Sequence, residues 1–122
     1  MRKLQTHDVF MALKLIRAAG VKDEVSRIVN FIEIKEKEGK RVSIRDVGVE
    51  FILGVMEKLT GTESENAFYE LLAGPLEIEA EEIRTMDPLD LIDKVKDLQE
   101  VIDGERLKRF FKSVAGLMEK LD

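Results

Sequence analysis

Few side chains in this sequence are suited to nucleophilic, acid–base or metal chemistry. The chain contains no cysteine and only one histidine, His7, which excludes thiol nucleophiles, disulfides and cysteine-ligated zinc. His7 has neither a cysteine nor an evident catalytic partner beside it, so we interpret it as an ordinary surface residue in the first turn of a helix. The sequence therefore predicts no catalytic residue, and we expect a protein that is not an enzyme.

Carboxylate pairs are the remaining candidates for acid–base or metal chemistry. Glu81 and Glu82 are one such pair, but the chain has 25 acidic residues in all. No pair has the ligand spacing of an EF-hand or of a Glu-x-x-His motif, so we interpret these pairs as solvated faces. Gly48 and Gly54 stand alone within a helical pattern, which favours close helix packing over a phosphate-binding loop. The sequence predicts neither a metal nor a cofactor.

The charge balance argues against a nucleic-acid partner. The net charge is −5, whereas non-specific affinity for nucleic acid comes from Lys and Arg that neutralise phosphates. The stretch "RVSIRDVGVEF", Arg41–Phe51, resembles the opening of the helix-turn-helix in lactose-repressor-type regulators. Here the apolar helix simply continues, and no exposed recognition helix follows. We expect no binding to nucleic acid.

Membrane insertion and secretion are also disfavoured by the sequence. No run of about 18 apolar residues exists, and the first 20 residues carry charges where a signal peptide would be apolar. The segment "RLKRFFKSVAGLMEKL", Arg106–Leu121, is amphipathic, but acids such as Glu119 weaken its attraction to anionic lipid. Together with the lack of cysteine, these features favour a cytoplasmic protein without a membrane partner.

The few polar groups must therefore be positioned by helices. Apolar residues recur at helical spacing almost throughout, and Gly or Pro interrupts the pattern at intervals suited to helices. With 122 residues, the chain has the length of one domain with a substantial core. We predict an all-α fold, a single-domain helical bundle of about six or seven helices spanning residues 1–122. The expected helices cover approximately residues 7–19, 23–38, 43–60, 64–73, 79–85, 88–103 and 106–121.

Several helix ends have recognisable signals. Thr6 is a plausible N-cap for the first helix and Gly20 its stop. Ser43 and Asp46 lie three apart at the start of the third, as in a capping box. The dipeptide Gly74–Pro75 is expected to end the fourth helix. The clearest start is Asp87 followed by Pro88, an N-cap aspartate before a first-turn proline.

The third predicted helix is apolar over most of its circumference. One side carries Phe51 and Val55, and further apolar residues extend round the helix, leaving a thin polar strip of Asp46, Glu50 and Glu57. Such a helix is typical of the middle of a bundle. We therefore expect it at the centre of the fold, with the other helices packed around it.

The last helix has an inner seam and a surplus of apolar surface. Its seam is formed by Leu107, Phe111, Val114, Met118 and Leu121. Phe110 and Leu117 lie beside this seam, and Met11 and Leu15 lie similarly off the inner stripe of the first helix. We predict that these four residues help to bind a partner or another copy of the chain. Phe31 and Ile34 on the second helix are likewise off-face, and all six residues are either core packed on several sides or apolar surface for a partner.

The order of these features resembles the tail assembly chaperones of long-tailed siphophages and related prophages. The likeness covers nearly the whole chain, and its most specific parts are "EEIRTMDPLDLIDKVKDL" and the closing "RLKRFFKSVAGLM". The resemblance implies a small helical protein of the host cytoplasm that coats the tape measure protein and recruits tail tube subunits. It also implies that a frameshifted, longer form exists in many members. The segment "GPLEIEA" departs from the family pattern by lengthening the link that follows the fourth helix.

A second hypothesis stays open beside the chaperone. A generic helical adaptor of phage or bacterial origin is compatible with the same amphipathic helices, and so is self-association as a homo-oligomer. The family resemblance supplies no residue-level binding motif that transfers to this chain. The two hypotheses differ in the client, since only the chaperone must keep a tape measure protein soluble.

Overall fold

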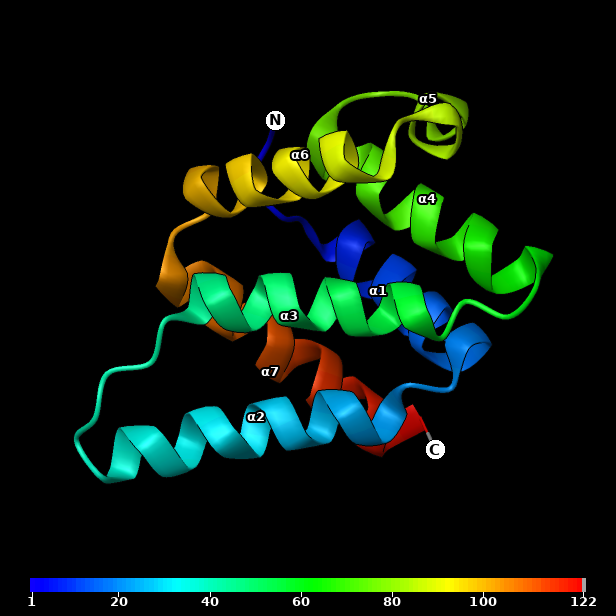
Figure 1. Cartoon of the computed structure of the whole chain (residues 1–122). Coiled ribbons are helices and arrows are strands. Elements are labelled where there is room, and N and C mark those ends of the chain that lie inside the picture. The colour runs from blue at the N-terminus through cyan, green and yellow to red at the C-terminus, as the bar shows by residue number, and fades with distance from the viewer. Residues whose placement is uncertain (122) are drawn as a thin grey trace.

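The computed structural model describes residues 1–121, with side chains through Lys120, and it is all-helical within that range (Figure 1). This confirms the predicted helical bundle and the predicted number of helices. The elements are α1 (Thr6–Ala19), α2 (Lys22–Lys37), α3 (Ile44–Glu57), α4 (Thr62–Leu76), α5 (Ala80–Thr85), α6 (Pro88–Val101) and α7 (Gly104–Leu121).

Three of the predicted helix ends are confirmed in atomic detail. The Ser43 hydroxyl accepts a hydrogen bond from the backbone N–H of Asp46 at 3.3 Å and caps α3. The Asp87 carboxylate accepts from the N–H of Leu89 at 2.8 Å, and Pro88 occupies the first turn of α6. Gly20 follows α1 in the left-handed conformation, with φ 68°. These local signals act within one turn, which explains why the sequence was sufficient to place them.

The end of α4 differs from the prediction. The helix does not stop before Gly74–Pro75 but continues to Leu76, and Glu77 ends it in a left-handed conformation with φ 58°. A proline has no backbone N–H, so it cannot donate a hydrogen bond to the carbonyl of the residue four positions earlier in the helix. Pro75 lies in the last turn, where the helix has only one further residue to hold, and its carbonyl accepts a hydrogen bond from the N–H of Arg2 at 2.8 Å. A tertiary contact therefore satisfies one of the carbonyls that the end of a helix leaves without an intrahelical donor.

The N-cap of α1 also differs from the prediction, because Gln5 rather than Thr6 occupies that position. Asp8, which is 1% exposed, reaches back and accepts from the Gln5 N–H at 2.7 Å. The same carboxylate binds both terminal nitrogens of Arg2, at 2.7 and 2.9 Å. Gly74 passes so close that an added Cβ would lie 2.5 Å from the Arg2 guanidinium. This buried pair joins the first five residues, α1 and the end of α4.

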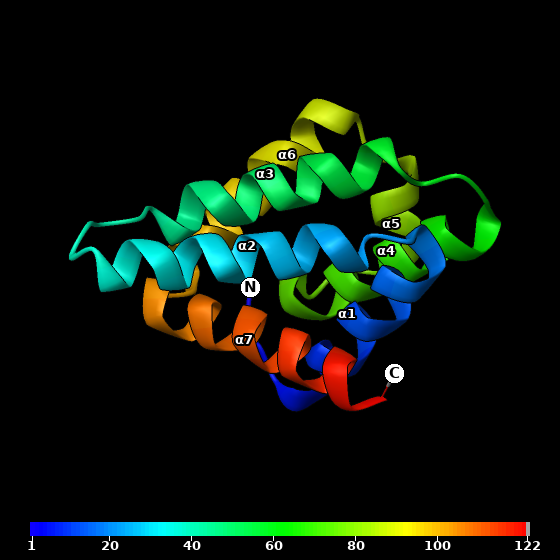
Figure 2. The same cartoon turned by 90° about the horizontal axis from the view of Figure 1, so that it is seen from below.

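The seven helices have unequal neighbours. α1 packs along α4, and α4 contacts the short α5. α7 has three partners, because it lies against α1, α2 and α3, whereas α3 packs on α6 and α7 and makes only sparse contact with α2. Figure 2 shows α2 across the middle of the view, with α3 on one side and α7 on the other. The buried seam of α7 is as predicted for Leu107, Phe111, Val114 and Met118, while the side chain of Leu121 lies outside the described residues.

α3 is less buried than the sequence predicted. Val55 is buried as expected, but it is the only apolar side chain that α3 contributes to the fully buried core, and Phe51 is half-buried. The helix lies between α6 and α2, with α7 behind it, and its front is uncovered (Figure 1). Because α3 contacts three other helices, it has apolar residues on three sides. The prediction of a mostly apolar circumference was correct, but the conclusion that α3 lies at the centre of the bundle was wrong. α3 lies at the outside of the bundle, not at its centre.

Replacing Asp8 by alanine tests the buried pair. Asp8→Ala removes the cap interaction of α1 and leaves Arg2 without its partner, so we expect a loss of about 2 to 4 kcal/mol in the free energy of unfolding, measured by urea denaturation. Asp90→Ala is the matched control, since Asp90 occupies the same first-turn position of α6 but is exposed and unpaired within the described residues. Its cost should be below about 1 kcal/mol. Equal losses for the two variants would contradict the role assigned to Asp8.

Two phenylalanines distinguish the core from its edge. The Phe111 ring is buried and meets Phe51 edge-on, with ring centroids 5.7 Å apart. We expect Phe111→Ala to cost about 3 to 5 kcal/mol and the half-buried Phe51→Ala about 1 to 3 kcal/mol. Chemical denaturation of both variants checks the order. A larger loss for Phe51 would place α3 at the centre after all.

Candidate functional site

The four residues predicted to bind a partner do not form an exposed ridge. Phe110, Leu117 and Met11 are half-buried and pack against the apolar core. Leu15 has an exposed fraction of 0%, so it cannot contact a partner in this structure, and its assignment is corrected. Its position off the inner stripe was misleading because α1 is covered by both α4 and α7.

The off-face residues of α2, in contrast, are exposed to solvent. The side chains of Phe31 and Ile34 are 46% and 54% exposed, respectively. For these two, the structure selects the second interpretation, apolar surface. Lys35 covers part of Phe31, with its ammonium 5.6 Å from the ring centre. An exposed aromatic ring beside a hollow is the usual form of an anchor for a partner.

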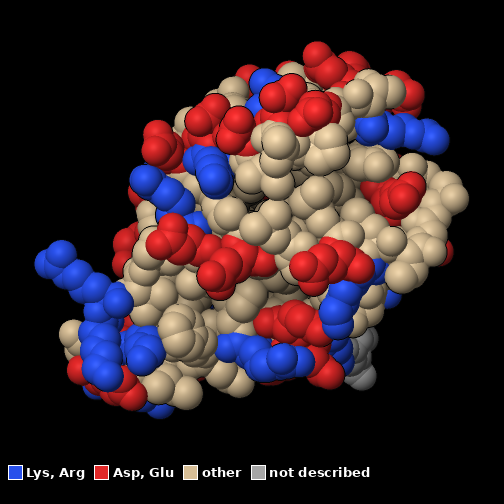
Figure 3. Space-filling model, in the orientation of Figure 1, with Lys and Arg blue, Asp and Glu red and all other residues tan. Residues whose placement is uncertain are grey.

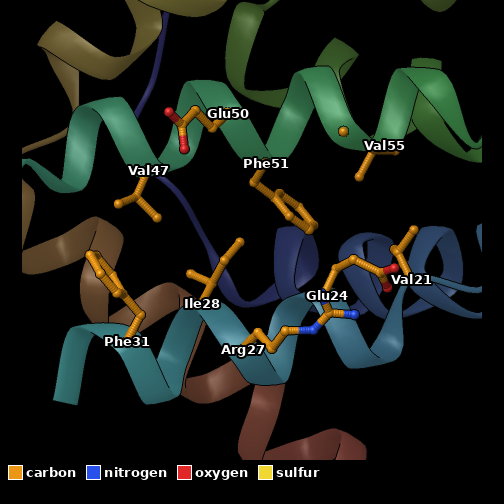
Figure 4. A pocket seen from close by; sticks show the side chains of 10 residues that line it. Val21, Glu24, Arg27, Ile28, Phe31, Val47, Glu50, Phe51 and Val55 are labelled. Carbon is orange, nitrogen blue, oxygen red and sulfur yellow. The ribbon is translucent and has the colours of Figure 1, made fainter. Parts of the chain in front are cut away.

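Phe31 lies at the edge of a groove between α2 and α3 that has a volume of about 380 Å³. The groove is long and open, and both helices contribute side chains that point into it (Figure 4). Its lining comprises Val21, Glu24, Arg27, Ile28 and Phe31 from α2 and its N-cap, and Val47, Glu50, Phe51, Gly54 and Val55 from α3. The α3 positions follow the spacing of one helical face, three, four, seven and eight residues after the first. The structure thus opens an apolar face of α3 to solvent.

The groove exists because α2 and α3 rest on a common neighbour and scarcely on each other. Both contact α7 extensively, and Phe51 reaches Phe111 of α7 at the floor. Gly54 widens the groove, since an added Cβ there would have no heavy atom within 4 Å. A side chain at this position would therefore project into open space. The groove keeps its shape because Gly54 has no side chain.

Charged groups border the apolar floor. Lys58 donates a hydrogen bond to Glu24 Oε1 at 2.7 Å and so ties α2 to the end of α3. This bond lowers the pKa of the Glu24 carboxyl below its usual value. The other oxygen, Glu24 Oε2, is buried and has no hydrogen-bond partner. Arg27 and Glu50 complete the polar lining. A salt-linked carboxylate, one arginine and a glutamate around an apolar floor are suited to recognition.

No cluster of catalytic or metal-binding groups accompanies the groove. His7 is exposed on α1 and does not line it. Across residues 1–121, no three His, Cys, Asp or Glu side chains are grouped so that they could hold a metal ion. Over the same residues, no helix has the length and apolar character needed to cross a membrane. The groove, with the exposed Phe31 ring at its edge, is the candidate site.

Comparison with known proteins adds no relative. No family model matches the chain, and neither a curated protein nor a solved structure is significantly similar to it. The likeness to tail assembly chaperones described above therefore stays a prediction.

Replacing glycine by alanine is expected to have different effects on stability at Gly54 and at Gly48. Glycine in a helix interior costs about 0.5 to 1 kcal/mol relative to alanine, and at Gly54 a methyl group meets nothing. Gly54→Ala should therefore raise the free energy of unfolding by about that amount. At Gly48 the new Cβ would lie 2.8 Å from Oε1 of the buried Gln99, so Gly48→Ala should give no such gain. Thermal and urea unfolding of both variants test this, and a stabilising Gly48→Ala would contradict the close packing of α3 on α6.

Proposed function

We propose that the protein is a non-catalytic binding protein that holds a helix of another protein in the groove between α2 and α3. The observation that carries this proposal is the open apolar groove itself, with the exposed ring of Phe31 at its edge. The lining residues on α2 and its N-cap extend from Val21 to Phe31, and ten steps at a rise of 1.5 Å per residue give a length of about 15 Å. Two to three turns of an incoming helix match that length.

A helix fits this groove better than an extended peptide does. Binding of an extended strand requires an open sheet edge that offers backbone N–H and C=O groups, whereas the described part of the chain is helical and uses its backbone groups internally. An amphipathic helix satisfies its own backbone and offers only an apolar stripe. Placed over Phe51 and Gly54, which are half-buried and exposed respectively, such a stripe would give α3 a neighbour on its uncovered side.

We further propose that the client is a long, helix-rich protein that aggregates when its apolar stripes are uncovered. This is the task of a tail assembly chaperone, with a tape measure protein as client and tail tube subunits recruited afterwards in the host cytoplasm. The sequence resemblance supports that identity, and the groove supports the mode of binding. The alternative is a helical adaptor for a different partner that uses the same groove.

Filling the groove tests the binding mode without disturbing the core. Gly54→Leu adds a side chain whose Cβ would meet no heavy atom within 4 Å and which projects from there into the groove, so the variant should fold with unchanged or higher stability. Co-expressed with the tape measure protein of the same phage, the unmodified chain should keep that protein in the soluble fraction, and Gly54→Leu should lose most of this effect.

The matched control is Gly116→Leu, which fills a second open glycine position on α7, outside the groove. It should preserve solubilisation fully. If the tape measure protein is equally soluble with and without the unmodified chain, the chaperone proposal fails. If Gly54→Leu solubilises it as well as Gly116→Leu does, the chaperone survives and the groove is not its binding site.

A further inference from the structure

A row of acidic side chains follows α3 along the edge of the groove, and Glu50 in this row also lines the groove. Asp46, Glu50 and Glu57 lie four and seven residues apart, so they fall within about 40° of one line along the helix. All three are exposed, and Leu53 lies in the same row between Glu50 and Glu57. Figure 3 shows the corresponding band of acidic side chains across the middle of the face that the groove occupies.

These three carboxylates are not neutralised by the protein itself. Within the described residues, none of them forms an ion pair or accepts a hydrogen bond from a basic side chain, although many other surface acids do. The nearest basic neighbours in the sequence are engaged elsewhere. Arg45 pairs with Glu100 at 3.5 Å, and Lys58 pairs with Glu24 on the opposite wall. A row of three unpaired acidic side chains, interrupted by Leu53, thus follows one edge of the apolar groove.

The opposite wall has a different character. Its charged lining residues are Arg27 and Glu24, and Lys58 already binds Glu24. The free oxygen of Glu24 adds a buried, unpartnered acceptor to the groove. The charges along the two edges of the groove are therefore asymmetric, acidic and unpaired along α3 and of both signs along α2.

We infer that the occupant of the groove is an amphipathic helix with Lys or Arg along the flank that faces α3. This inference rests on the proposed helix-binding function and specifies the chemistry of the client. The apolar stripe of the client fills the groove floor, and its basic flank lies against Asp46, Glu50 and Glu57. Complementary charges of this kind select partners and fix their register. They also exclude helices whose flanks are acidic.

Three synthetic helices of about 20 residues, a length that favours stable helix, provide the probes. They share one stripe of leucines at helical spacing and differ only in the flanking residues, which are Lys, Gln or Glu. Binding to the full-length protein is measured by calorimetric titration at about 50 mM and about 500 mM salt. We expect the Lys helix to bind about tenfold more tightly than the Gln helix at low salt, with the Glu helix weakest. High salt should largely remove these differences.

Charge reversal separates the α3 row from the net charge of the protein. Glu50→Lys combined with Glu57→Lys should reverse the preference, so that the Glu helix binds more tightly than the Lys helix. Asp93→Lys combined with Asp97→Lys changes the net charge equally on α6, outside the groove, and should leave the preference for the Lys helix intact. Gly54→Leu should abolish binding of all three helices.

The outcomes distinguish the two proposals. If all three helices bind equally and Gly54→Leu abolishes their binding, the groove binds helices but its charge does not select them, and only the inference is overturned. If reversal on α6 has the same effect as reversal on α3, the preference comes from overall charge, which also overturns the inference. If none of the helices binds the unmodified protein, the proposed function fails together with it.

Discussion

The candidate site depends on α7 being the common support of α2 and α3. These two helices are consecutive in the chain and lie antiparallel, an arrangement in which neighbours usually close on each other. Here each packs against α7 instead, and Phe51 meets Phe111 at the floor. The space between them stays open because both helices are already stabilised by a third. Because both walls of this hollow are packed against α7, the proposed binding of a helix would require little rearrangement of the protein.

A second constraint fixes the far side of the bundle. Asp8 is an almost fully buried carboxylate, and it is stable there because Arg2 and the Gln5 N–H supply three short hydrogen bonds. The same contact orients the N-terminal segment across Gly74 and the end of α4. With α1 and α4 locked together, α1 offers α7 a rigid surface on which to pack. The N-terminal pair and the groove are therefore linked through α7, although they lie on different helices.

The sequence predicted those parts of the fold that are set within one or two turns. Helix caps at Ser43 and Asp87, the stop at Gly20 and the buried seam of α7 all follow from local spacing and side-chain chemistry. The continuation of α4 through Pro75 was missed because it relies on Arg2, more than 70 residues away in the chain. The burial of Leu15 and the exposure of α3 were missed for a related reason. A helical pattern gives the width of an apolar face, but not how many neighbours will cover it.

The groove illustrates this limit most clearly, since Phe31 and the polar strip of α3 were singled out from the sequence but were not placed beside each other. Phe31 was recognised as off-face, and the strip of Asp46, Glu50 and Glu57 was recognised as the polar side of α3. What the sequence did not contain was the separation of α2 from α3, which places these two features along one opening. In the structure, the apolar residues of α3 and its unpaired acidic residues border the same groove, so one binding partner can account for both. Together they describe the complement of a helix with an apolar stripe and a basic flank.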